Sequence, residues 1–222
     1  MNVVEARNRM VDGQVRTADV TDLRILAAML DLPREPFVQP DKADLAYTDL
    51  DIPLGSDSPG AAPRRLMRPR NFAKLVQAAD VSATDRVLDA GCATGYGAAV
   101  LARLAAEVVA LDEDRALTAF AAKALAECRL DNVTVATAPI AAGFPAQAPY
   151  DVIVLEGASE ISPRALLSQL ADGGRLVCVE GRGRVGRAML YVASGGAVSG
   201  RSVFDAAAPL LPGFAAPPAF VF

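Results

Sequence analysis

The chain has 222 residues, a formal net charge of −4 and a hydrophobic content of 52%, which fits one α/β domain with a large core. No run reaches the ~18 uninterrupted apolar residues of a membrane span, and the charged N-terminus lacks the apolar stretch of a signal peptide. The three cysteines have no metal-binding or redox spacing. We therefore expect a cytoplasmic protein that binds no metal and contacts no membrane.

The sequence contains no histidine. This excludes the commonest general base and metal ligand, and with them the Ser-His-Asp and Cys-His mechanisms. Any reaction must therefore depend on positioning, carboxylates, hydroxyls or a cofactor that has its own reactivity.

The N-terminal part predicts a small helical cap. Two short helices are expected over residues 2–14 and 22–31. Thr21 is a suitable N-cap for the second helix, which ends before Pro33.

A loop and a helix follow the cap. Residues 50–70 are rich in proline, glycine and serine, which predicts a loop next to a site. Proline suits the first turn of the helix predicted over residues 69–79. We expect residues 1–80 to form the cap and substrate loop, packed on a core of residues 81–222.

The remaining chain alternates between strands and helices, which is typical of a doubly wound, mostly parallel sheet. The predicted elements are 86–90, 95–105, 107–111, 114–128, 132–136, 150–155, 163–170 and 174–179. Interior strands of such a sheet are apolar on both faces, as are 86–90, 107–111, 150–155 and 174–179. Segments 188–193 and 198–205 flank Gly195–Gly196 and predict an antiparallel hairpin at the sheet edge.

A candidate cofactor site begins at Val87–Tyr96, which joins an apolar strand to a glycine-containing turn and an alanine-rich helix. Glycine at the end of a parallel strand lets the backbone approach a ligand closely. About 20 residues further on, a second strand ends at Asp112, where a ribose diol needs an acceptor. The predicted site residues are Asp89, Gly91, Cys92, Ala93, Gly95 and Asp112.

Several of these residues have a second interpretation. Asp112 also suits the cap of the following helix, and Asp89 equally suits a brace for the loop. Cys92 either faces the cofactor or packs within the loop. Ala93 is tolerated there if its φ stays negative.

Ordered motifs along nearly the whole chain resemble those of the protein-L-isoaspartate O-methyltransferase family. They are Arg9-Met-Val-Asp-x-Gln-Val-Arg16, Thr21-Asp22, Pro33-Arg34-Glu35-x-Phe37-Val38, Leu45-Ala46-Tyr47, Ile52-Pro53-Leu54-Gly55, Gly95-Tyr96, Asn132-Val133-Thr134-Val135, Ala148-Pro149-Tyr150-Asp151 and Gly173-Gly174-Arg175-Leu176-Val177. The resemblance implies a Rossmann-like methyltransferase fold and S-adenosyl-L-methionine as cofactor. It also implies protein repair, by methyl transfer to the side-chain carboxylate of isoaspartyl residues in damaged proteins. Such a carboxylate is ionised at neutral pH, so its attack on a sulfonium methyl needs placement and no general base.

The chain departs from the family pattern at several positions. Arg65 and Met67 stand where the family's substrate loop has hydroxyls, so no catalytic residue is identified. Pro139 replaces an acid that binds the adenine amino group, and Ala93 replaces the central glycine of the cofactor loop. Glu156 replaces a threonine, which leaves either a new cofactor contact or a solvated strand end. We therefore expect little or no isoaspartyl methyltransferase activity.

Four arginines lie between positions 64 and 70. Arg64, Arg65 and Arg68 are candidates to bind a substrate carboxylate or phosphate, and the alternative is a solvated charge run. Nucleic-acid binding is disfavoured by the net charge of −4 and the absence of interleaved aromatic residues. Three functions remain open: an isoaspartyl repair enzyme, a methyltransferase for another anionic substrate, or a non-catalytic binding protein on the same scaffold.

Overall fold

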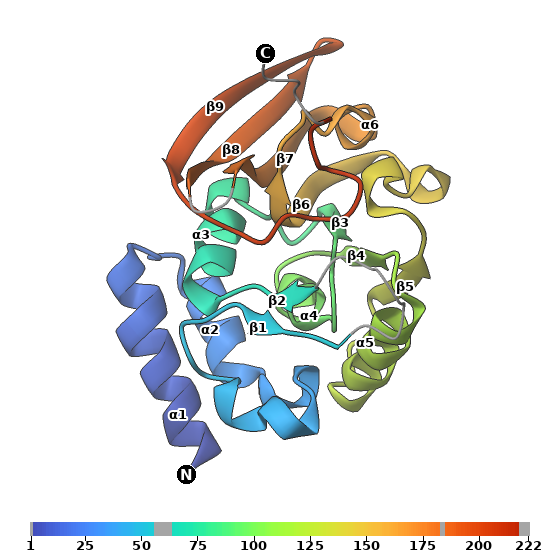
Figure 1. Ribbon diagram of the computed structural model, residues 1–222. Coiled ribbons are helices and arrows are strands. Elements are labelled where there is room, and N and C mark those ends of the chain that lie inside the picture. Colours follow the sequence, from blue (N-terminus) through green and yellow to red (C-terminus); the bar gives the residue numbers. More distant parts are fainter. Residues whose placement is uncertain (1, 56–63, 183–184, 218–222) are drawn as a thin grey trace, which may run out of the picture.

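A sheet of seven strands runs through the computed structural model, which describes residues 2–55, 64–182 and 185–217 (Figure 1). Its strands lie in the order β5-β4-β3-β6-β7-β8-β9. Their bounds are β3 Arg86–Ala90, β4 Glu107–Asp112, β5 Val133–Thr137, β6 Tyr150–Ser159, β7 Leu170–Arg182, β8 Val185–Ser194 and β9 Ala197–Asp205. Strands β3 to β7 pair in parallel, whereas β8 and β9 pair antiparallel. The predicted doubly wound sheet with an antiparallel edge is confirmed.

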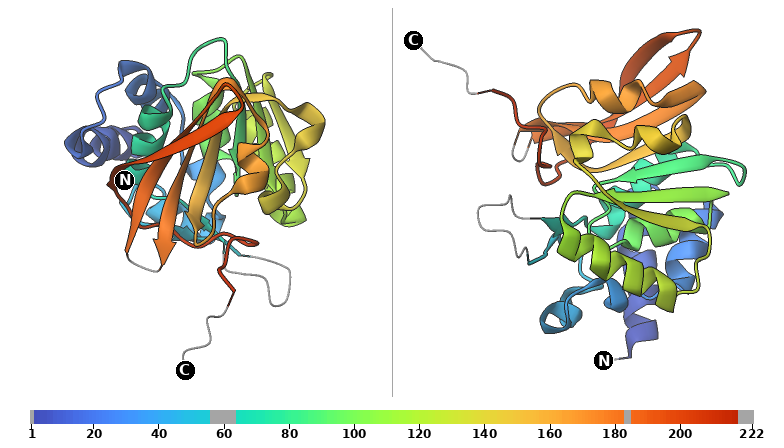
Figure 2. Two further views of the ribbon diagram at one scale, coloured as in Figure 1. Left: turned by 90° about the horizontal axis from the view of Figure 1, so that it is seen from above. Right: turned by 90° about the vertical axis from the view of Figure 1, so that its right-hand side faces the viewer.

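Along the chain, the helices and the short turns of 3₁₀ and π type either precede β3 or connect successive strands (Figure 2). The helices are α1 Val3–Met10, α2 Leu23–Asp31, α3 Pro69–Ala79, α4 Tyr96–Ala102, α5 Arg115–Glu127 and α6 Arg164–Leu167. The short turns are η1 Val11–Val15, η2 Arg16–Ala18, η3 Glu35–Phe37, η4 Pro40–Leu45, η5 Ile140–Ala142 and η6 Pro145–Gln147.

The two faces of the sheet belong to two hydrophobic clusters, because alternate residues of a strand point to opposite faces. Val87 packs with the apolar residues of α1 to α5, and the N-terminal helices share this cluster. Leu88 packs on the other face, with η5, α6 and two residues near the C-terminus, Leu211 and Phe214. Both faces are therefore covered, as the apolar interior strands predict.

The N-terminus of α2 differs from the prediction. Asp22, not Thr21, is the N-cap, and its side chain accepts a hydrogen bond from the Arg24 amide. The Thr21 amide and hydroxyl instead donate to Oε1 of Gln77, at 2.7 and 3.5 Å. The threonine therefore joins α2 to α3.

Two further predictions need correction. The helix predicted over 163–170 is limited to Arg164–Leu167, because Leu170 already pairs with Tyr150 as the start of β7. The predicted loop 50–70 contains two short strands, β1 Ile52–Pro53 and β2 Arg65–Leu66. Its central part, residues 56–63, lies outside the described residues.

The chain after β9 returns to the middle of the sheet. The Ala158 amide donates to the Pro209 carbonyl at 2.7 Å, and the Leu211 amide donates to the Ala158 carbonyl at 3.0 Å. These bonds hold Leu211 beside the carboxyl end of β6. Among the described residues, no helix combines the length and the apolar character that a membrane-spanning segment requires.

Candidate active site

The cofactor loop predicted from the sequence connects β3 to α4 and is bound to the neighbouring strand β4. The amides of Gly91 and Cys92 both donate to the Leu111 carbonyl, at 2.8 and 3.0 Å. Gly91 has φ +82° and Gly95 has φ +90°, conformations that suit glycine. The loop is therefore rigidly positioned at the carboxyl end of β3, where ligands bind in open parallel sheets.

Ala93 has φ +51°, so the expectation that its φ stays negative is wrong. A left-handed conformation places the β-carbon of an L-residue close to the carbonyl that follows it. Two bonds hold the backbone there: the Ala93 amide donates to Asp112 Oδ2 at 2.9 Å, and the Gly95 amide donates to the Cys92 carbonyl at 2.8 Å. The loop keeps its shape despite this side chain.

Asp112 ends β4 directly beside the loop, and its side chain is fully buried. Its Oδ2 accepts a hydrogen bond from the Ala93 amide, and its Oδ1 accepts one from the Asp114 amide at 3.2 Å. Arg64 donates through Nη2 to Asp112 Oδ2 at 2.5 Å and to the Gly91 carbonyl at 3.1 Å. The cap of the following helix is Asp114 rather than Asp112, so the interpretation of Asp112 as that cap is wrong.

Two side chains lie over the glycine of the cofactor loop. A β-carbon on Gly91 would lie 3.2 Å from Leu211 Cδ2 and 3.5 Å from Arg64 Nη2. These two residues come from distant segments of the chain. They cover the part of the loop at which a bound nucleotide would contact the protein backbone. Nothing in the sequence pattern predicts the position of Leu211.

Asp89 and Glu156 form a buried acidic pair at the ends of adjacent strands. Their carboxyl groups lie within hydrogen-bonding reach of each other. Burial raises the pKa of both groups, and the charge of Asp89 raises the pKa of Glu156 further. Glu156 is 5% exposed, which excludes the solvated strand end. Two adjacent buried carboxyl groups therefore resist being ionised at the same time.

A buried arginine faces this pair from the N-terminal cap. Burial lowers the pKa of Arg34, and the Glu156 charge partly opposes that shift. Its guanidinium lies 4.3 Å from the centre of the Tyr96 ring and donates through Nη2 to the Met67 carbonyl at 2.7 Å. The sequence identified Arg34 only as part of a cap motif, because its burial depends on tertiary contacts.

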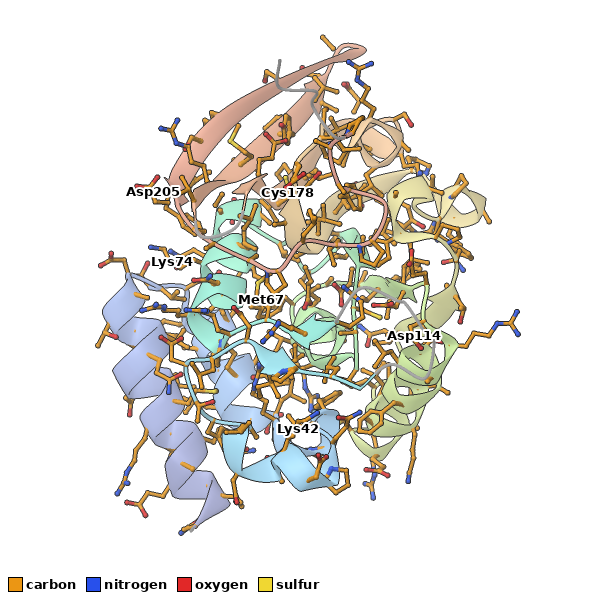
Figure 3. All side chains as sticks on the ribbon, in the orientation of Figure 1. Lys42, Met67, Lys74, Asp114, Cys178 and Asp205 are labelled. Atoms are coloured by element: carbon orange, nitrogen blue, oxygen red, sulfur yellow. The ribbon has the colours of Figure 1, made fainter. Side chains whose placement is uncertain are left out.

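Met67 and Cys92 are both enclosed in the molecule. Met67 is 2% exposed and lies between the short strand β2 and α3 (Figure 3). Cys92 is fully buried, and burial raises its pKa well above the usual value for a thiol. Cys92 is thus an unreactive packing residue of the loop.

The arginine cluster divides into one buried and three partly exposed side chains. Arg68 pairs with Asp51 through Nε at 3.3 Å and Nη2 at 2.8 Å. Arg65 is exposed and donates to the Asp51 carbonyl at 3.3 Å, and Arg70 pairs with Asp49 at 3.1 Å. These three arginines bind Asp49 and Asp51 of the preceding segment, Arg68 and Arg70 through the carboxylates and Arg65 through a backbone carbonyl. Arg64 is the member of the cluster that reaches the cofactor loop.

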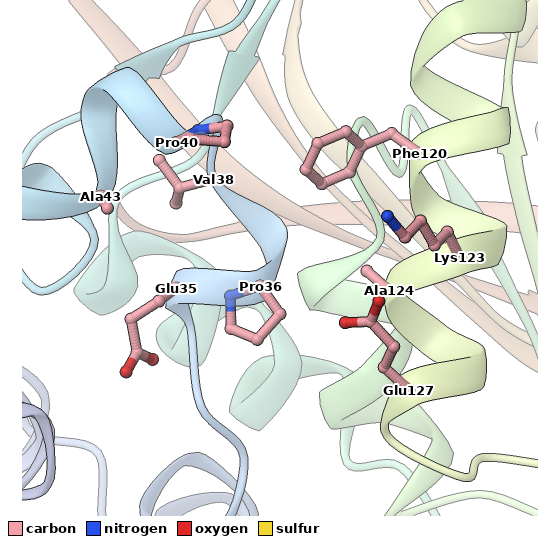
Figure 4. A pocket seen from close by; sticks show the side chains of 9 residues that line it. All are labelled: Glu35, Pro36, Val38, Pro40, Ala43, Phe120, Lys123, Ala124 and Glu127. Carbon is pink, nitrogen blue, oxygen red and sulfur yellow. The ribbon is translucent and has the colours of Figure 1, made fainter.

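A separate pocket of about 290 Å³ lies between the N-terminal cap and α5 (Figure 4). It is lined by Glu35, Pro36, Val38, Pro40, Ala43, Phe120, Lys123, Ala124 and Glu127. It contains none of the site residues predicted from the sequence. In the described part of the chain, no cluster of three or more cysteine, aspartate or glutamate residues is arranged to hold a metal ion.

Comparison with known proteins gives consistent matches. The family model for protein-L-isoaspartate(D-aspartate) O-methyltransferase matches residues 5–203. A protein-L-isoaspartate O-methyltransferase from Methanoregula boonei is 40% identical over 185 residues, which cover 83% of this chain and 81% of that protein.

Two solved structures share the fold. One protein-L-isoaspartate O-methyltransferase has a TM-score of 0.79 and 24% identity, with 93% of this chain and 66% of that chain covered. A Plasmodium falciparum structure assigned to the same enzyme class, in complex with S-adenosyl-L-homocysteine, has a TM-score of 0.74 and 15% identity. It covers 92% of this chain and 97% of that chain.

Proposed function

Because the chain belongs to the protein-L-isoaspartate(D-aspartate) O-methyltransferase family, we propose that it transfers a methyl group from S-adenosyl-L-methionine to the side-chain carboxylate of isoaspartyl residues in proteins. The observation that carries the proposal is Asp112. This fully buried carboxylate lies beside a positive-φ loop at the carboxyl ends of two parallel strands. A buried acid at this point of an open parallel sheet suits the two hydroxyls of a ribose.

The side chains at the site fit such a donor in their chemistry. Asp112 offers an acceptor for ribose hydroxyls, and the loop at Gly91 and Ala93 has the backbone conformation that a close ligand needs. When bound, the donor supplies an electrophilic methyl group on a sulfonium. The chain then has to orient the acceptor carboxylate and keep water out, which needs no histidine.

A second candidate is a methyltransferase for another anionic substrate. It is supported by Met67, a buried thioether at a position where a family hydroxyl is expected. Arg64 supplies a cation for an anionic substrate at the same site. Methyl transfer to isoaspartyl peptides and to small organic carboxylates, measured side by side, separates the two candidates.

The test begins with calorimetric titration of the purified protein with S-adenosyl-L-homocysteine and S-adenosyl-L-methionine. Methyl transfer is then measured on an isoaspartyl peptide and on the matching aspartyl peptide, and we expect selective modification of the isoaspartyl form. Tight donor binding without transfer to either peptide or to any small carboxylate would favour the non-catalytic scaffold.

One substitution tests the assigned donor site. Asp112→Ala should weaken binding of S-adenosyl-L-homocysteine by about 1.5–3 kcal/mol, because charge-assisted hydrogen bonds to the ribose are lost. Asp41→Ala, which removes an exposed acid of η4, is the matched control. Thermal unfolding of both variants checks that the loop still folds without the Asp112 bonds. Unchanged affinity in folded Asp112→Ala would remove Asp112 from the donor site.

A further inference from the structure

Arg64 holds the position on Asp112 that a donor ribose needs. The Arg64 guanidinium binds Asp112 Oδ2 and the Gly91 carbonyl with the same nitrogen, Nη2. The side chain is 5% exposed, and its partner carboxylate is fully buried. A ribose cannot bond to Asp112 at the Arg64 side of this carboxylate until the guanidinium moves.

The pairing of Arg64 is incomplete, which distinguishes it from Arg68. Arg68 binds both oxygens of Asp51 with two different nitrogens, a bidentate geometry that adds strength. Arg64 Nε is buried and lacks a hydrogen-bond partner among the described residues. A buried donor without a partner reduces the net stability of such a contact. The contact of Arg64 with Asp112 is therefore less complete than that of Arg68 with Asp51, which leaves room for a competing ligand.

If Arg64 leaves Asp112, the other acids of the site compensate its positive charge only in part. The charges of Asp89 and Glu156 both interact with the Arg64 charge, but Arg34 also faces Glu156. Once it has left Asp112, the Arg64 guanidinium therefore needs a further anion, and a substrate carboxylate is the anion that the proposed reaction requires.

We propose that Arg64 is a displaceable occupant of the donor site: the donor ribose replaces it on Asp112, and the released guanidinium then binds the substrate carboxylate. The inference rests on the proposed function and deepens it. It makes donor and substrate binding ordered and cooperative, since the cation that recognises the substrate becomes available when the donor binds. It also gives a role to the one arginine of the cluster that is buried.

The first test measures donor-site affinity. S-adenosyl-L-homocysteine is titrated calorimetrically into the wild-type protein, Arg64→Met and Arg70→Met. Arg70→Met is the matched control, because it removes the same charge from a partly exposed ion pair with Asp49. We expect Arg64→Met to bind S-adenosyl-L-homocysteine about 10-fold more tightly than the wild type, because no guanidinium then competes for Asp112. Equal or weaker binding by Arg64→Met overturns the competition.

A double-mutant cycle locates the effect on Asp112. In an Asp112→Asn background, Arg64→Met should tighten S-adenosyl-L-homocysteine binding by less than about twofold, because the competing ion pair is already removed. A full 10-fold effect in that background contradicts the proposal. Arg64→Gln serves as a second variant if the methionine variant does not fold.

The second test measures cooperativity with an isoaspartyl peptide. Saturating S-adenosyl-L-homocysteine should tighten peptide binding to the wild type by about 10-fold, and the peptide should tighten nucleoside binding by the same factor. Arg64→Met should lose this coupling. Coupling that persists in Arg64→Met overturns the role of the released guanidinium. If neither the wild type nor any variant binds S-adenosyl-L-homocysteine, the proposed function is overturned together with this inference. If the wild type binds it normally and Arg64→Met binds it with the same affinity, the inference alone is overturned.

Discussion

The carboxylate of Glu156 in β6 occupies the space that a β-carbon on Gly97 of α4 would take. Phe72 of α3 closes the same space from the other side, with Cε2 2.9 Å from that β-carbon position. The glycine thus makes room in a helix for a buried acid at a position where the family resemblance predicts a threonine. The acid and the glycine form one packing unit.

Gly97→Ala should destabilise the protein by about 1–3 kcal/mol, because the added methyl overpacks a closed site. In a Glu156→Thr background the same substitution should cost less, since the shorter side chain leaves the space free. Gly13→Ala is the control, because no atom lies within 4 Å of its β-carbon position. Chemical denaturation measures all four variants, and an equal cost in both backgrounds would contradict this packing unit.

The buried acidic pair predicts that stability falls as pH rises. In the unfolded chain both acids ionise near pH 4, whereas in the folded protein burial raises the pKa of Asp89 and of Glu156. Above pH 4 the folded state therefore binds more protons than the unfolded state, so each increase in pH lowers the free energy of unfolding until the folded pKa values are passed.

Glu156→Gln removes one of these two charges without changing the side-chain shape. We expect it to be more stable than the wild type by about 1–3 kcal/mol at pH 8. The difference should shrink towards pH 5, because the pKa of Glu156 is raised in the folded protein. Urea denaturation across this range measures the effect, with the exposed Glu127→Gln as control. A difference that stays constant with pH would show that Glu156 does not titrate as inferred.

The strained loop residue gives a third prediction. Ala93→Gly should raise the free energy of unfolding by about 1 kcal/mol, because glycine has no steric cost at φ +51°. Ala98→Gly, within α4, should instead lower it by a similar amount, since glycine disfavours a helix interior. Thermal unfolding of the two variants provides the comparison. Destabilisation in both would mean that the Ala93 methyl contributes more by packing than it costs in strain.

The sequence predicts the elements with strong local signals and not the contacts made by distant segments. The runs at 86–90 and 69–79 are found within those bounds, because apolar character and the initial proline define them locally. The turn between β3 and α4 follows from its glycines, and its assignment to a cofactor stays a prediction. Arg34 and Leu211 reach the site through tertiary packing, and no local pattern distinguishes them from other residues of their kind.

The final prediction concerns the substrate loop. Met67 is buried, but its carbonyl, not its side chain, binds Arg34, so a serine at this position keeps that hydrogen bond. Arg65 is exposed on β2, and its replacement by threonine removes no buried contact. If hydroxyls at these two positions, which the family resemblance predicts, each contribute about 1–2 kcal/mol to the transition state, Arg65→Thr with Met67→Ser should raise kcat/KM on an isoaspartyl peptide by roughly 10- to 10³-fold.

The variant with Arg65→Ala and Met67→Ala is the matched control, because it removes the same side chains without adding hydroxyls. Loss of the buried thioether should cost both double variants about 2–4 kcal/mol of stability, so turnover is measured well below their unfolding temperatures. A rise limited to the threonine–serine variant assigns the effect to the hydroxyls. A rise of equal size in the alanine variant would show instead that Arg65 and Met67 obstruct the substrate, and fast turnover by the wild type would show that the hydroxyls are dispensable in this chain.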